Sequence, residues 1–204
     1  VVAYPAPEHG ESLARAIVAS YLSGTQTEIA IRMPLDANRF PVEAVYDRAA
    51  EEISAHLAAG RDVAAICEGD PFFYGSFMYL YGRLAHRHDV VVVPGVSSLV
   101  ACPAAAGAPL AARDDVLLVC PATLPEEELA RRLAGVEAAA VIKVGRHLAK
   151  VRRVIETAGL TERARYVEHA TMADQRILAL ADLDEARAPY FSMILIHRRG
   201  EAWR

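Results

Sequence analysis

The stretch Glu68-Gly69-Asp70-Pro71-Phe72-Phe73-Tyr74-Gly75-Ser76-Phe77-Met78-Tyr79 places an acidic turn directly before a group of aromatic residues. The mostly apolar residues 62–67 precede it and predict a short buried strand, which Gly69 and Pro71 end. In open parallel α/β sheets, ligands bind beyond the carboxyl ends of the strands. The stretch therefore predicts a ligand-binding loop, followed by a helix over 76–86.

Strand and helix patterns alternate on both sides of this loop. Strands are predicted at 1–5, 29–33, 62–67 and 90–93, and helices at 13–22, 42–57, 76–86 and from Ser97-Ser98 to near Gly107. Segment 90–93 is wholly apolar, which is typical of a strand buried on both faces. The order predicts a parallel sheet covered by helices.

A second series of elements follows the charged, proline-containing segment 109–115. Strands are predicted at 116–120, 140–144, 166–168, 177–180 and 190–196, with helices after Pro125 and Gly145 and irregular connections near the end. The predicted fold class is therefore α/β with two domains. Residues 1–110 are expected to carry a parallel sheet and residues 111–204 a mixed one.

Composition excludes several function classes. The net charge is −4, and only two of the 22 basic residues are lysines, which argues against a nucleic-acid-binding surface. No apolar run reaches the length of a membrane-spanning helix. The three cysteines lie in or beside apolar runs and predict buried free thiols in a reducing, cytoplasmic compartment. The seven histidines show no HExxH spacing, so no metal site is expected.

The chemistry of the opening loop has two interpretations. Asp70 could bind a ribose hydroxyl pair or a cationic group, or it could close an Asx turn with its own backbone. Phe72, Phe73, Tyr74 and Tyr79 could be core residues at helical spacing, or they could contact a flat ligand.

Two further loops follow predicted strands. Ser97 and Ser98, in Pro94-Gly95-Val96-Ser97-Ser98, could bind polar ligand atoms or could cap a helix. The spacing does not fit a nucleophile elbow, which needs a glycine two residues after the serine. Arg146 and His147 could meet an anion or could face solvent at a helix start.

Taken together, five segments resemble the tetrapyrrole methylases, and the resemblance covers essentially the whole chain. They are the opening stretch 68–79, Pro-Gly-Val-Ser-Ser at 94–98, Lys-Val-Gly-Arg-His at 143–147, His-Ala-Thr-Met-Ala-Asp-Gln at 169–175 and Pro-Tyr-Phe-Ser-Met at 189–193. The resemblance is strongest to the branch that acts on C20 of precorrin-2. It implies a homodimer, two α/β domains per chain, and S-adenosylmethionine bound in the cleft between the domains.

The resemblance also implies an activity and a set of cofactor residues. The activity is methyl transfer to the C20 meso carbon of precorrin-2, giving precorrin-3A on the route to cobalamin. The cofactor residues carried over by matching motifs are Gly69, Asp70, Phe72, Phe73, Ser97, Ser98, Val144, His169, Ala170, Ser192 and Met193. The family's first strand and its Gly-Pro-Gly-Asp-Pro loop are expected before Val1, and a chain lacking them is expected to bind substrate poorly.

Methyl transfer from a sulfonium needs neither a metal nor a covalent enzyme intermediate, and alignment of the reacting atoms can supply much of the catalysis. Precorrin-2 carries carboxylates, so arginines are the expected clamps: Arg32, Arg39, Arg113 and Arg176. Candidate proton acceptors are Glu68, Tyr74 and Tyr79. The alternatives are a methylase acting at another ring position or on the cobalt-bound substrate, a branch that modifies a histidine or ribosomal RNA, and a silent nucleotide-binding module.

Overall fold

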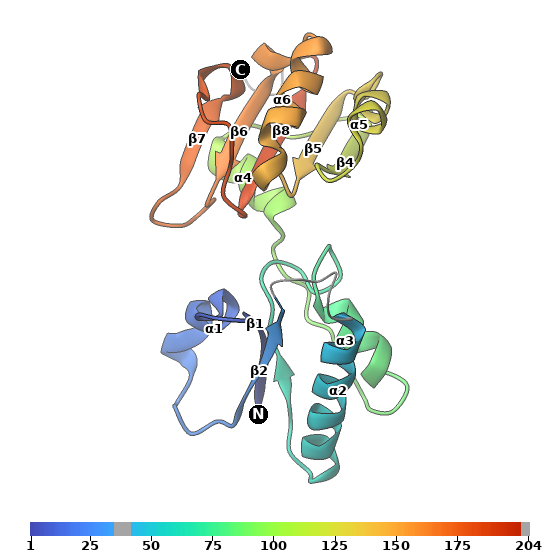
Figure 1. Ribbon diagram of the computed structural model, residues 1–204, viewed down its shortest axis with the longest axis vertical. Helices are drawn as coiled ribbons and strands as arrows, with labels where there is room; N and C mark the ends of the chain where they lie inside the picture. The colour runs from blue at the N-terminus through green and yellow to red at the C-terminus, as the bar shows by residue number, and fades with distance from the viewer. Residues whose placement is uncertain (35–41, 201–204) are drawn as a thin grey trace. The chain divides into compact units, whose positions relative to one another are not determined.

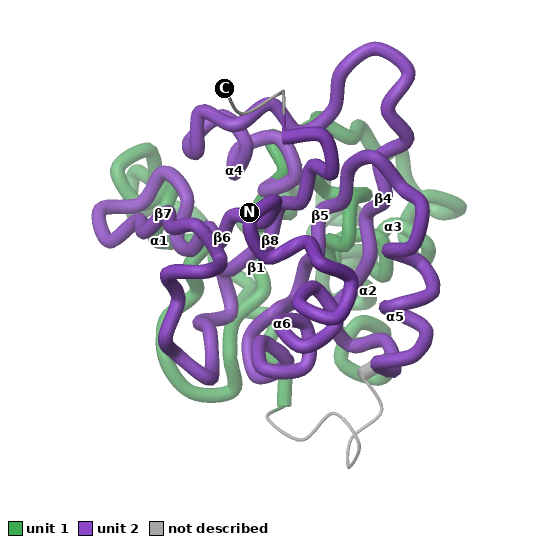
Figure 2. Tube along the Cα trace, turned by 90° about the horizontal axis from the view of Figure 1, so that it is seen from above, with its two compact units in different colours: residues 1–97 green, residues 98–204 purple. Residues whose placement is uncertain are grey.

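The computed structural model describes residues 1–34 and 42–200, which form two compact units (Figures 1 and 2). Unit 1 comprises residues 1–97 and unit 2 residues 98–204. The division falls before helix α4 (Ser98–Ala106) rather than at residue 110. Cys102 of α4 packs in one hydrophobic cluster with Ala140 and Val167 of the second sheet, so this helix belongs to unit 2.

Unit 1 is built on a three-stranded parallel sheet in the order β2-β1-β3 (Figure 1). The strands are β1 (Val2–Pro7), β2 (Glu28–Met33) and β3 (Ala64–Ala65). The helical elements are α1 (Leu13–Val18), η1 (Ala19–Tyr21), α2 (Val42–Ala58) and α3 (Phe77–Leu84). The parallel sheet predicted for the first half of the chain is confirmed.

Local sequence explains most of these elements. Ser12 caps α1, because its hydroxyl oxygen accepts a hydrogen bond from the backbone N–H of Arg15 at 3.3 Å. Ile29 and Ile31 alternate with exposed residues of β2 and are buried, as the spacing predicts. They pack in one cluster with Ile53 of α2 and Leu80 of α3.

The strand predicted at 90–93 is wrong. These residues have no regular structure, and the side chains of Val91 and Val93 are 87% and 73% exposed. The strand predicted at 62–67 shortens to Ala64–Ala65. An apolar run becomes a strand only where a neighbouring strand accepts its backbone hydrogen bonds, and nothing in 1–34 or 42–200 pairs with 90–93.

Unit 2 is built on a five-stranded mixed sheet in the order β4-β5-β8-β6-β7, which confirms the prediction for the second half. The strands are β4 (Leu117–Pro121), β5 (Ala138–Ile142), β6 (Ala164–Glu168), β7 (Arg176–Ala179) and β8 (Ser192–His197). The helical elements besides α4 are α5 (Glu126–Leu133), η2 (Gly145–His147), α6 (Leu148–Thr157), η3 (Thr161–Arg163) and η4 (Leu180–Asp182).

Strand β5 shows why this sheet is buried on both faces. Successive side chains of a strand point to opposite faces, and all five residues of β5 are buried. Ala139 and Val141 share a cluster with residues of α5 and α6, whereas Ala140 and Ile142 share one with Cys102 of α4. Helices therefore cover both faces, as Figure 1 shows for α6 in front and α4 behind.

The cysteines agree in part with the prediction of buried thiols. All three are free; Cys102 and Cys120 are buried, and Cys67 is half-buried. Burial raises the pKa of the Cys102 and Cys120 thiols to about 11. Across the described ranges, no helix combines the length and apolar character needed to span a bilayer.

Candidate functional site

In unit 1, Asp70 ties the loop after β3 to the loop that precedes α4. Its Oδ1 accepts a hydrogen bond from the backbone N–H of Phe72 at 2.9 Å, and its Oδ2 accepts one from Gly95 at 2.9 Å. These backbone donors hold the pKa of Asp70 below its ordinary value, and the N–H of Gly95 has the largest effect. The bond to Phe72 is the Asx turn of the structural interpretation, and the bond to Gly95 brings two separate ligand-type loops together.

Glycines allow the backbones of these two loops to touch. A Cβ at Gly95 would lie 2.1 Å from the carbonyl oxygen of Gly69, so residue 95 has no room for a side chain. Gly69 itself has φ +71°, in the left-handed region that favours glycine. Gly69, Asp70, Phe72 and Phe73 lie in one loop, and the Cα of Ser97 would be 3.7 Å from a Cβ added at Gly69.

The aromatic residues divide between core and surface. Phe77 packs against the hydrophobic core of unit 1, whereas Phe72, Tyr74 and Tyr79 are 48%, 47% and 51% exposed. Phe72 makes an edge contact with Tyr81, with ring centroids 4.9 Å apart. Tyr74 has φ +55°, a left-handed conformation uncommon outside glycine, which places it among candidate functional residues. Phe72, Tyr74 and Tyr79 thus each present part of a large ring at the surface of unit 1.

The other predicted residues of unit 1 have identifiable local roles. Glu68 accepts a hydrogen bond from the backbone N–H of Ala14 at 3.2 Å and so serves the amino-terminal end of α1. Tyr79 stacks at a tilt on Tyr46, with ring centroids 5.1 Å apart. Ser98 is the first residue of α4, a position in keeping with the capping interpretation.

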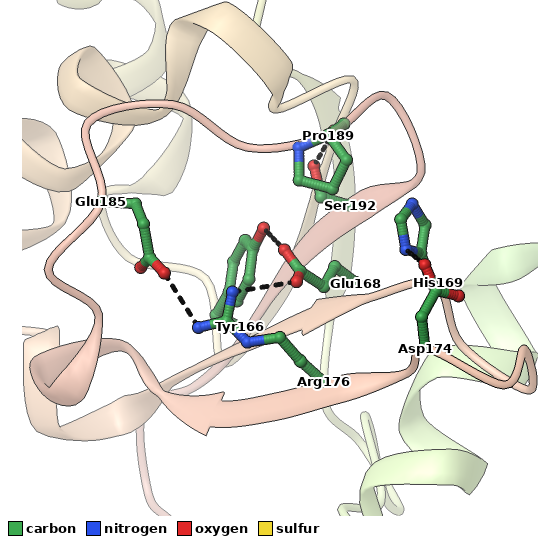
Figure 3. A network of polar contacts seen from close by, with 8 residues as sticks. All are labelled: Tyr166, Glu168, His169, Asp174, Arg176, Glu185, Pro189 and Ser192. Carbon is green, nitrogen blue, oxygen red and sulfur yellow. Dashed lines mark hydrogen bonds and ion pairs between the residues drawn. The ribbon is translucent and has the colours of Figure 1, made fainter.

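In unit 2, four predicted cofactor residues lie together at the adjoining ends of β6 and β8. Glu168 pairs with Ser192 in the antiparallel register, and the next residue, His169, donates its backbone N–H to Phe191 at 2.9 Å. Ala170 follows His169, and Met193 follows Ser192. The hydroxyl of Ser192 donates to the Pro189 carbonyl at 2.7 Å, as Figure 3 shows.

Burial decides which of these residues can offer side-chain atoms. Met193 is 2% exposed and packs in the core, and Val144, after β5, is fully buried. Either residue could therefore meet a ligand only through its backbone. His169 is different, because its side chain is 23% exposed and its Nδ1 lies 2.6 Å from Asp174 Oδ2.

The predicted carboxylate clamps occupy different environments. Arg176 donates to Glu168 at 3.0 Å and to Glu185 at 2.9 Å, so its guanidinium already pairs with two carboxylates (Figure 3). Arg32 donates to the carbonyl oxygen of Pro7 at 3.1 Å. Arg113 is exposed with φ +52°, and Arg39 lies outside the described residues.

Sequence reasoning missed the residues that support the predicted ones. Gly95, Glu168 and Asp174 each hold a predicted site residue by a hydrogen bond or an ion pair. For Asp174 a signal was present, since an acid five residues after a histidine in a polar loop can fold back on it. Nothing in the sequence ties Gly95 to Asp70, which lies 25 residues earlier.

The fold and the loops of the two units indicate a broad class of protein. A parallel α/β unit and a mixed α/β unit each gather polar and glycine residues in loops beyond strand ends, as in small-molecule enzymes of the α/β class. The chain belongs to the tetrapyrrole (corrin/porphyrin) methylases, whose family model matches residues 1–186. The fold class predicted from the sequence is thereby confirmed.

Known proteins of this family resemble the chain over nearly its whole length. The precorrin-2 C(20)-methyltransferase of a Sinorhizobium species is 43% identical over 96% of this chain and 83% of its own. The cobalamin biosynthesis protein CobIJ of Mycobacterium tuberculosis is 46% identical over 96% of this chain. The chain spans only 40% of the length of that mycobacterial relative.

A solved structure agrees with the fold. The X-ray structure of the cobalt precorrin-4 methyltransferase CbiF superimposes with a TM-score of 0.69 at 23% identity, covering 96% of this chain and 83% of that one. The shared fold extends over both units of the chain.

Proposed function

We propose that the protein transfers the methyl group of S-adenosylmethionine to the C20 meso carbon of precorrin-2, giving precorrin-3A in cobalamin biosynthesis. The observation that carries this proposal is the 43% identity to an enzyme named precorrin-2 C(20)-methyltransferase over 96% of the chain. The family match over residues 1–186 supports methyl transfer to a tetrapyrrole.

The chemistry demands little of the protein beyond binding and orientation. When bound, S-adenosylmethionine supplies an electrophilic methyl group on a sulfonium. The electron-rich meso carbon of the substrate is its own nucleophile, so the chain needs neither a serine nor a cysteine activated for attack. Holding two reactants in line can supply roughly 7–11 kcal/mol of a barrier at best. The rigid loop contacts around Asp70 and Gly95 suit such a task.

The described residues fit an adenosyl ligand in two respects. In unit 1, Gly69 and Gly95 let two loops meet, so Gly69, Asp70 and Ser97 lie together beyond a strand end, where α/β proteins bind ligands. His169 in unit 2 has an imidazole that is 23% exposed and whose Nε2 meets no partner in the described ranges. We propose His169, Ser192, Phe72 and Phe73 as cofactor contacts through their side chains, and Val144, Ala170 and Met193 through their backbones.

Substrate contacts follow from charge and exposure. Of the three predicted arginines that the structure describes, Arg113 is the strongest proposed clamp, because it is exposed and because a guanidinium offers a planar fork of donors that matches a carboxylate. Arg32 already donates to a backbone carbonyl, and Arg176 already serves two glutamates. A proton must also leave the substrate during the reaction, and Tyr74, Tyr79 and Glu68 remain the proposed acceptors. Homodimer formation and a cytoplasmic location are further proposals.

Two measurements test the proposal, one of cofactor binding and one of methyl transfer. Calorimetry should detect binding of S-adenosylhomocysteine, and incubation with labelled S-adenosylmethionine should transfer label to precorrin-2. Cofactor binding without transfer to any tetrapyrrole would favour a silent nucleotide-binding module. Transfer only to cobalt-loaded precorrin-2, with metal-free substrate as the parallel arm, would replace the substrate in this proposal by its cobalt complex.

A further inference from the structure

His169 and Asp174 form a pair within one short loop of unit 2. The loop joins β6 to β7, and the imidazole Nδ1 of His169 lies 2.6 Å from Oδ2 of Asp174. Figure 3 shows the second ring nitrogen pointing away from Asp174. The carboxylate of Asp174 is 65% exposed, so the pair is not part of the hydrophobic core.

The contact determines which nitrogen of the neutral ring carries the hydrogen. An ionised carboxylate only accepts hydrogen bonds, so the neutral imidazole must carry its hydrogen on Nδ1. Nε2 then has a lone pair and is an acceptor. Among residues 1–34 and 42–200, no donor reaches that lone pair.

The loop backbone holds the histidine in an unusual conformation. His169 has φ +48° and Thr171 has φ +68°, and such left-handed residues persist only where surrounding contacts hold them. Here the Thr171 N–H donates to the Gln175 side chain at 2.6 Å, and the Met172 N–H donates to the His169 carbonyl at 2.9 Å. Two hydrogen bonds within the loop therefore stabilise the backbone conformation that orients the imidazole.

We propose that Asp174 is a positioning residue that holds His169 with Nε2 as a hydrogen-bond acceptor for the nucleoside of the cofactor. The inference rests on the proposed function, which makes S-adenosylmethionine the ligand. The group that Nε2 accepts from is a hydrogen-bond donor, either the adenine amino group or a ribose hydroxyl. Asp174 itself touches no ligand atom in this account.

The first experiment reads the tautomer of His169 directly. Nitrogen-15 spectra of the labelled protein at pH 8 should show His169 protonated on Nδ1, with the signal assigned by comparison with His169→Gln. Asp174→Asn should lose that preference, because a neutral amide can donate to Nδ1 as well as accept from it. Asp174→Glu, which keeps the carboxylate, should restore it in part. A wild-type His169 protonated on Nε2 would overturn the inference.

The second experiment measures binding of S-adenosylhomocysteine by calorimetry. Asp174→Asn should bind about fivefold to tenfold more weakly than wild type, the factor expected for one ordinary hydrogen bond. Asp184→Asn, at an exposed acid of the same unit, is the matched control and should bind like wild type. Equal affinity of Asp174→Asn and wild type would overturn the inference alone, whereas a wild type that binds no cofactor would overturn the proposed function.

Two ligand analogues identify the donor. If the adenine amino group donates to Nε2, wild type should bind the deaminated analogue more weakly than S-adenosylhomocysteine itself. Asp174→Asn should bind the two ligands with nearly equal affinity, because it has already lost that hydrogen bond. If a ribose hydroxyl donates, the 2′- or 3′-deoxy analogue should show this pattern instead. Equal losses in wild type and variant for every analogue would contradict an acceptor role for His169.

Discussion

Glu168 and Arg176 face each other across the β6–β7 hairpin, and Arg176 Nη1 donates to Glu168 Oε1 at 3.0 Å. Glu168 also accepts a hydrogen bond from the hydroxyl of Tyr166, and its side chain is only 9% exposed. The pair joins the two strand ends between which the loop carrying His169 runs (Figure 3). The guanidinium predicted to bind substrate carboxylates thus binds carboxylates of the protein.

Because of this pairing, we expect Arg176 to contribute to the stability of the fold. Arg176→Met should lower the free energy of unfolding, measured with urea, because it leaves the nearly buried Glu168 carboxylate without its cation. Glu185→Gln removes the more exposed partner of the same arginine and should lower stability less. Unchanged stability of Arg176→Met together with weaker precorrin-2 binding would return Arg176 to the role of a clamp.

Gly95 should tolerate no side chain. Gly95→Ala places a Cβ 2.1 Å from the Gly69 carbonyl oxygen and should cost about 1–3 kcal/mol of stability, since the neighbour is backbone. Gly82→Ala is the matched control, because Gly82 lies in α3 with nothing within 4 Å of its added Cβ. That variant should gain about 0.5–1 kcal/mol from the better helix former. Thermal or urea unfolding of both variants and of wild type measures the two changes in stability, which should have opposite signs.

Asp70 should matter for cofactor affinity through the loops that it joins. Asp70→Ala removes the acceptor for the backbone N–H groups of Phe72 and Gly95, and we expect about tenfold weaker binding of S-adenosylhomocysteine. Asp70→Asn keeps one acceptor oxygen, so its affinity for S-adenosylhomocysteine should lie between those of wild type and Asp70→Ala. Asp62→Ala, at an exposed acid before β3, is the control. Unchanged calorimetric affinity of Asp70→Ala would leave Asp70 with only its Asx turn.

The interaction of Glu28 with Arg15 and Tyr4 should make stability depend on pH. Hydrogen bonds from Arg15 and then from Tyr4 lower the pKa of Glu28 to about 2 from 4.5. A carboxyl group with a lowered pKa in the folded state contributes stability above its unfolded pKa, and that contribution is lost as pH falls from 4.5 towards 2.

The measurement compares Glu28→Gln with wild type by urea unfolding from pH 7 to pH 2. The difference in stability should be full at pH 7 and should shrink below pH 4.5, because protonated wild type then resembles the variant. Glu11→Gln, at an exposed position, is the control. A difference that stays constant down to pH 2 would contradict the lowered pKa of Glu28.

Local patterns in the sequence predicted much of the fold. The alternation of Ile29 and Ile31 and the cap at Ser12 each determine an element through neighbours only a few residues away. The strand predicted at 140–144 forms two residues earlier, as β5. Segment 90–93 has the same apolar character but no strand partner in the described ranges, and pairing is not a property of the segment itself.

The places of the candidate site residues after the strands were predictable, but the contacts that they make were not. Gly69, Asp70 and His169 follow the strand ends where the sequence placed them. The hydrogen bond from Gly95 to Asp70 depends on two loops meeting after folding, and the ion pair of Arg176 depends on the hairpin register. Such contacts between distant residues decide whether a charged side chain serves a ligand or the protein.

The position of methyl transfer separates the C20 reaction from its alternatives, and carbon-13 NMR of the product reads that position. The protein is incubated with precorrin-2 and S-adenosylmethionine labelled in its methyl carbon. We expect one labelled methyl group, attached to C20 of the macrocycle. A label on any other ring carbon would contradict it.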